Sequence, residues 1–139
     1  MVKEFSNENI KKVIQTRNTK IGLSDEGIVM VTYPQGIDET LEDAEENLNA
    51  LDKICNGKKL PIFIDPGPHK SLSREARIYY VKHSPEYAIA VAVLVKSTFA
   101  KVLSAFLITL NKTINKGKFP IQFFTSQEKA LDWLRRING

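Results

Sequence analysis

The side chains best able to do chemistry gather in one stretch, Leu60–Arg77, which reads LPIFIDPGPHKSLSREAR. The pattern predicts a buried strand, a turn broken by prolines and a glycine, and the start of a helix. Ligands and partners meet open α/β sheets at such strand ends, and a helix N-terminus attracts anions. The basic side chains can equally face solvent. The candidate contacts for a partner or an anion are Asp65, Gly67, His69, Lys70, Ser71, Ser73, Arg74 and Arg77.

Asp65 closes the predicted strand, where a carboxylate can serve in catalysis or accept amide hydrogen bonds from the following turn. The second role is expected, because no other reactive group converges with it. The histidines, His69 and His83, have no metal-ligand spacing with each other or with Cys55. The sequence also lacks a nucleophile elbow, a P-loop and a dinucleotide fingerprint. We therefore expect no catalytic residue, metal or cofactor, and a protein that is not an enzyme.

Length and composition predict one domain over residues 1–139, with 42% apolar and 26% charged residues. The single cysteine forbids an internal disulfide, and no apolar run of signal-peptide or membrane-span length is present, so a cytoplasmic location is expected. Net charge is −5 over residues 1–56 and +9 over residues 57–139. The basic residues are scattered and no nucleic-acid-binding motif accompanies them, which argues against nucleic acid as the partner.

The elements that must position these groups can be predicted from periodicity. Residues 1–16 define no clear element, and TKIGLSDEGIVMVTYP then predicts a hairpin that turns at Gly27. Apolar spacing predicts a helix over Asp38–Cys55, with its many acidic residues on a solvated face. Strands are expected at Ile62–Ile64, Tyr87–Lys96 and Phe119–Phe124. Helices are expected at 73–84, 98–115 and from a capping box at Thr125–Glu128 to Asn138.

The resulting order, ββαβαβαβα, predicts an α/β fold with a mixed, mainly parallel five-stranded sheet and about four helices. The helix over 98–115 is apolar around most of its surface. Its predicted core stripe is Phe99, Val102, Leu103, Phe106, Leu110 and Ile114. Ala105, Leu107 and Ile108 widen the apolar arc, so they form a candidate oligomer interface and a homo-oligomer is expected.

Four phrases, TKIGLSDEGIVMV, FIDPGPHKSLSREAR, AIAVAVLVKS and PIQFFTSQEKALDWL, occur in this order between Thr19 and Leu134. In order and spacing the chain resembles uncharacterised bacterial STAS-like (SpoIIAA-like) domains, which are related to anti-sigma-factor antagonists. The resemblance implies a SpoIIAA-like fold. In the antagonist branch, a serine that commonly follows an aspartate after this strand is phosphorylated by a kinase. Asp65 matches that aspartate, but Pro66 and Gly67 follow it, and the nearest serines are Ser71 and Ser73.

Two functional hypotheses follow from the sequence. The first is a non-enzymatic STAS-like module for protein interaction or regulation, with a protein partner or a second copy of itself. The second is a binder of a small anionic or amphipathic ligand, such as a nucleotide, phosphate or lipid. Its site would be the Gly67–Arg77 turn or an apolar pocket beside the helix over 98–115.

Overall fold

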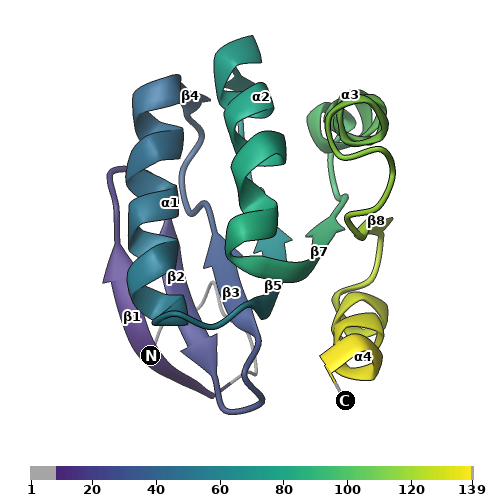
Figure 1. Ribbon diagram of the computed structural model, residues 1–139. Coiled ribbons are helices and arrows are strands. Elements are labelled where there is room, and N and C mark those ends of the chain that lie inside the picture. Colours follow the sequence, from purple (N-terminus) through teal and green to yellow (C-terminus); the bar gives the residue numbers. More distant parts are fainter. Residues whose placement is uncertain (1–8, 139) are drawn as a thin grey trace.

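The computed structural model describes residues 9–138, which form a six-stranded sheet packed between helices (Figure 1). The spatial order of the strands is β1-β2-β3-β5-β7-β8. The pairs β1–β2 and β2–β3 are antiparallel, and all later pairs are parallel. The strand bounds are β1 Ile10–Gln15, β2 Lys20–Ser24, β3 Val29–Thr32, β5 Leu60–Asp65, β7 Ala88–Leu94 and β8 Ile121–Phe124.

The predicted fold class is confirmed, with one strand more than expected in the main sheet. Part of the N-terminal segment that gave no clear element pairs along β2 as the edge strand β1. Its exposure alternates little, because four of its six residues face solvent. A weak apolar pattern of this kind does not distinguish an edge strand from an irregular segment. The first eight residues of that segment lie outside the described part of the chain.

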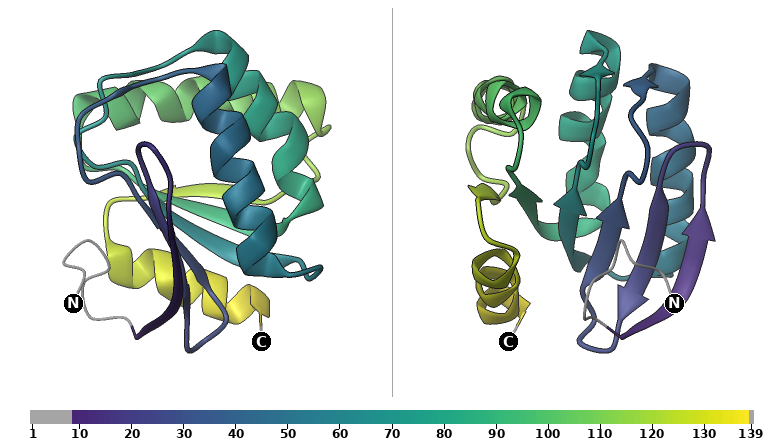
Figure 2. Two further views of the ribbon diagram at one scale, coloured as in Figure 1. Left: turned by 90° about the vertical axis from the view of Figure 1, so that its left-hand side faces the viewer. Right: turned by 180° about the vertical axis from the view of Figure 1, so that it is seen from behind.

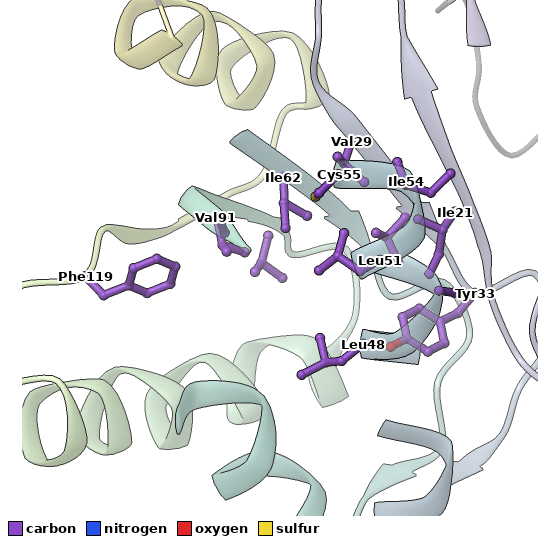
Figure 3. Packing of buried hydrophobic residues seen from close by; sticks show 14 residues of the cluster. Ile21, Val29, Tyr33, Leu48, Leu51, Ile54, Cys55, Ile62, Val91 and Phe119 are labelled. Carbon is purple, nitrogen blue, oxygen red and sulfur yellow. The ribbon is translucent and has the colours of Figure 1, made fainter. Parts of the chain in front are cut away.

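Helices cover both faces of the sheet, which explains the continuous apolar runs of β3 and β7. Three helices, α1 (Leu41–Cys55), α2 (Arg74–His83) and α3 (Thr98–Ile114), lie on one face, and α4 (Gln127–Asn138) lies on the other (Figures 1 and 2). A 3₁₀ turn, η2 (Ser84–Glu86), follows α2. Figure 3 shows the core beneath α1, where Leu48 and Leu51 pack with sheet residues such as Ile62 and Val91.

A second, two-stranded parallel sheet joins two loops at the carboxyl ends of β3 and β5. It pairs β4 (Asp38–Glu39) with β6 (Ser71–Leu72). The prediction that Asp38 and Glu39 open a solvated helix was therefore wrong. The helix begins at Leu41 because Thr40 is its N-cap, in a reciprocal capping box with Asp43. Glu39 consequently points inward, with 2% of its surface exposed.

Two further expectations need correction. Ser126, and not Thr125, caps α4, since its hydroxyl accepts a hydrogen bond from the Lys129 amide. On α3, Leu103 is buried as predicted, but Val102 and Phe106 are 54% and 53% exposed. A helix that is apolar nearly all round does not reveal from sequence which face it buries. No helix in the described part of the chain is both long and apolar enough to cross a membrane.

Candidate functional site

A partly enclosed cavity of about 110 Å³ lies between the sheet, α2 and α3. Its apolar walls are Ile64, Pro66, Leu72, Val81, Val91, Val93, Leu103, Leu107 and Ile121, and its polar groups are Tyr33, Glu39, His69, Tyr80 and Ser84. A wider hollow of about 460 Å³ lies at the N-terminus of α3, but none of the residues that line it is buried. An apolar cavity with a few convergent polar groups is the usual form of a small-molecule site.

The buried carboxylate of Glu39 is the centre of the polar end of the cavity. Its Oε2 accepts hydrogen bonds from the Tyr33 hydroxyl at 3.1 Å, the Asn47 amide at 3.1 Å and the Tyr80 hydroxyl. These donors come from the residue that follows β3, from α1 and from α2, so the carboxylate connects three parts of the chain that are distant in sequence. A carboxylate without such partners would be expensive to bury.

His69 faces the other carboxylate oxygen. Its Nε2 lies 2.8 Å from Oε1 of Glu39, although the two are poorly aligned for a hydrogen bond. Its Nδ1 lies 3.3 Å from the Pro66 carbonyl oxygen. Both ring nitrogens therefore face oxygen acceptors, which fits a doubly protonated imidazolium paired with Glu39. The side chains of His69 and Glu39 are only 4% and 1% exposed.

Aromatic rings fix the position of the imidazole. The His69 ring stacks on Phe99 of α3 with a centroid distance of 5.5 Å, and it meets Tyr33 edge-on at 4.4 Å. Aromatic faces attract cations, so this arrangement stabilises a charged ring. Burial raises the pKa of both Tyr33 and Tyr80 well above 10, and the neighbouring Glu39 charge acts in the same direction. Both phenols therefore stay protonated and can donate to the carboxylate.

The loop after β5 folds closely onto the end of β3, and a glycine permits it. Gly67 has a φ of +57°, and a Cβ atom there would lie 2.2 Å from the Tyr33 carbonyl oxygen. The Gly67 amide donates to the Asp65 carboxylate at 2.9 Å. This close approach brings His69 next to Tyr33 and Glu39. The expected structural role of Asp65 is thus confirmed.

The polar cluster continues away from the cavity through Asn47. The Asn47 side-chain oxygen accepts from the hydroxyls of Thr16 and Thr19, at 2.6 and 3.0 Å. Its amide group also donates to Asn18 and to the Tyr80 hydroxyl, at 3.3 and 2.9 Å. The turn between β1 and β2 is therefore connected to the cavity by buried hydrogen bonds, which order both.

The structure does not bring the sequence-predicted anion contacts together. His69 points into the protein, while Lys70 and Arg74 are exposed. The Arg77 guanidinium donates to the Leu72 carbonyl at 2.7 Å and lies 5.2 Å from the centre of the Phe106 ring. Among the serines, Ser71 donates to Asp38 at 2.6 Å, and Ser73 caps α2 by accepting from Ala76.

Sequence reasoning missed Tyr33, Glu39, Asn47 and Tyr80 as members of a site. Each lies at the end of a predicted strand or within a predicted helix, where a polar side chain is ordinary. The candidate oligomer residues lie as follows: Ala105 and Ile108 are exposed on α3, and Leu107 is half-buried against the cavity. In the described residues, no cluster of three or more His, Cys, Asp or Glu side chains is arranged for a metal ion.

The strand order and the arrangement of the helices define a mixed α/β domain with a SpoIIAA-like fold. The structure is similar to the crystal structure of an uncharacterized protein of the DUF3478 family with a SpoIIAA-like fold, from Shewanella loihica PV-4. The two are 19% identical in sequence, with a TM-score of 0.54, and the match covers 91% of this chain and 94% of the other. The chain belongs to the family described as "Domain of unknown function (DUF7793)", whose model matches residues 21–138. No curated protein matches its sequence.

Proposed function

We propose that this protein is a non-enzymatic binding domain that holds a small amphipathic ligand in the cavity between the sheet, α2 and α3. The observation that carries the proposal is the meeting of an unfilled apolar volume with the buried Glu39–His69 pair. Apolar walls favour the body of a ligand, and convergent polar groups fix its orientation. Because Tyr33, Tyr80 and Asn47 already donate to Glu39, these polar groups suit holding a ligand more than proton transfer to it.

The cavity volume limits the ligand that fits without rearrangement. A dry apolar cavity of about 150 Å³ holds benzene. The present cavity of about 110 Å³ is somewhat smaller but is open on part of its surface. A single ring or a short aliphatic chain is therefore the appropriate size for a first probe.

The proposal is tested by titrating ¹⁵N-labelled protein with toluene and phenol and following amide chemical shifts. Saturable shifts are expected at Leu72, Tyr80 and Leu103. Leu103→Phe, which fills the cavity, should weaken binding at least tenfold, about 1.4 kcal/mol. Val102→Phe adds the same ring at the neighbouring, exposed position of α3 and should bind as the wild type does. Absence of saturable shifts with either probe would refute the proposal.

A second candidate function, self-association, is favoured by the outer face of α3. Val102, Phe106 and Ile108 are 54%, 53% and 41% exposed there. Neighbouring exposed lysines on α3, Lys101 and Lys112, are opposite in charge to the exposed face of α1, which carries Glu42, Glu45, Glu46 and Asp52. This complementarity favours a second copy of the chain as the occupant.

Light scattering over a range of protein concentrations tests self-association. A dimer is expected, and Phe106→Glu should shift it to monomer because a charge would be buried in an apolar contact. Lys129→Glu, at an exposed position of α4 on the opposite face of the sheet, is the control. A clean monomer at millimolar concentration would remove this candidate.

A further inference from the structure

The polar end of the cavity also limits the chemistry of the ligand, a step that depends on the proposed ligand-binding function. We infer that the ligand carries an uncharged hydroxyl group at the end that meets Glu39 and His69. Its oxygen would accept a hydrogen bond from Nε2 of His69, and its proton would be donated to Oε1 of Glu39. The remainder of the molecule would be apolar and lie against Leu72, Leu103 and Leu107.

The first support is the hydrogen bonding of the two facing groups. Oε2 of Glu39 accepts hydrogen bonds from three donors, whereas among the described residues Oε1 accepts none and is approached by the poorly aligned Nε2 of His69. That nitrogen is buried and has no hydrogen-bond partner within the described residues. Buried polar groups normally have such partners, so an unsatisfied nitrogen on the wall of a cavity indicates a missing acceptor. A hydroxyl supplies an acceptor and a donor at one atom.

The second support is the charge balance. We take the His69 ring as an imidazolium, because both of its nitrogens face oxygen acceptors, so its charge balances that of the Glu39 carboxylate 2.8 Å away. An anionic head group would approach the carboxylate, and a cationic one would approach the imidazolium. Either would also bring an uncompensated charge between apolar walls, which is costly. A carbonyl or ether head group would avoid this cost but would give Glu39 no donor.

The experiment compares four probes that share one ring: phenol, toluene, benzoate and benzylamine. Each is titrated into wild-type protein at neutral pH, and dissociation constants are taken from amide chemical shifts at the cavity residues. Phenol should bind at least about tenfold more tightly than toluene, because its hydroxyl would form hydrogen bonds to charged groups. Benzoate and benzylamine should bind more weakly than toluene.

Glu39→Gln then tests the charge argument directly. Removing the carboxylate charge should reduce the advantage of phenol over toluene and increase the affinity for benzoate relative to wild type. If benzoate affinity stays unchanged in a folded Glu39→Gln protein, the inference is wrong. Should this variant not fold, the four wild-type constants decide the question by themselves.

The outcomes separate this inference from the proposed function. If toluene binds at the cavity as tightly as phenol, or either charged probe binds more tightly than phenol, the hydroxyl inference is overturned while ligand binding stands. If none of the four probes shifts the cavity residues, both are overturned. The ordering phenol, toluene, then the charged probes would support both.

Discussion

The Glu39–His69 pair makes a strong prediction about stability. In Glu39→Gln the shape is kept, but the carboxylate that accepts from Tyr33, Tyr80 and Asn47 loses its charge. Hydrogen bonds to a charged group contribute about 1.5–3 kcal/mol each, against about 0.5–1.5 kcal/mol for neutral ones. Three bonds weakened by about 1 kcal/mol each, and an imidazolium left without its counter-charge, give a loss of about 3–5 kcal/mol.

Urea unfolding followed by circular dichroism measures this loss, and a melting temperature lowered by roughly 10 °C or more should accompany it. Glu42→Gln is the matched control, because Glu42 is an exposed carboxylate on the first turn of α1. The control should change the free energy of unfolding by less than about 0.5 kcal/mol.

A double-mutant cycle with His69→Asn isolates the pair itself. Each single substitution leaves one buried charge unpaired, whereas the double variant leaves none. The losses in free energy of unfolding of the two single variants, added together, should therefore exceed the loss in the double variant by at least about 2 kcal/mol. Additivity within about 0.5 kcal/mol, or a Glu39→Gln protein as stable as Glu42→Gln, would refute the buried ion pair.

Arg17 and the capping box lower the pKa of Asp43 to about 2 from 3.8, so Asp43→Asn should lower the free energy of unfolding by about 1–2 kcal/mol at pH 6. The difference between variant and wild type should vanish as pH falls from about 4 towards 2. Equal losses at pH 6 and pH 2 in urea unfolding would contradict this prediction. Burial raises the pKa of the Cys55 thiol to about 11, so its reaction with Ellman's reagent at pH 8 should be roughly a hundredfold slower in native protein than in denaturant. Fast reaction of native protein would contradict this prediction and show that the core around Cys55 opens locally. Gly67→Ala should lower the free energy of unfolding by about 2 kcal/mol or more, because the added Cβ would meet the Tyr33 carbonyl oxygen. Gly57→Ala has open space around the added Cβ and should cost about 1 kcal/mol. Equal melting temperatures for the two variants would contradict the close approach at Gly67.

Local patterns in the sequence predicted most of the framework. The hairpin at Gly27 and the strand within Tyr87–Lys96 both depend on neighbouring residues, and both are present. Cys55, the last residue of the predicted helix, also ends α1 and lies in the core. Such features can be recognised because propensity, capping and turn chemistry act over only a few residues.

The site could not be predicted in the same way, because its contacts are long-range. Glu39 is buried since Asp38 pairs with Ser71, thirty-three positions away, to form the small sheet of β4 and β6. In sequence, Glu39 belongs to an acidic run that favours solvent. His69 likewise follows Gly67 and precedes Lys70, so composition suggested a basic surface, whereas the close approach at Gly67 turns the imidazole inward. The orientations of Glu39 and His69 are both set by the pairing of the loops that follow β3 and β5.

The coincidence of two costly features is the main argument for a ligand. An unfilled cavity of about 110 Å³ lowers stability by about 2–3 kcal/mol, at roughly 24 cal/mol per Å³. A buried ion pair is often no more stabilising than apolar residues of the same volume. In a core selected for stability alone, we would expect larger side chains to fill the cavity and apolar residues to replace the ion pair. Here they share a wall, with the unsatisfied Nε2 of His69 between them. Their adjacency fits a binding site. A ligand with an apolar body and a hydrogen-bonding end would fill the cavity and supply the missing hydrogen bond, and so would stabilise the folded protein.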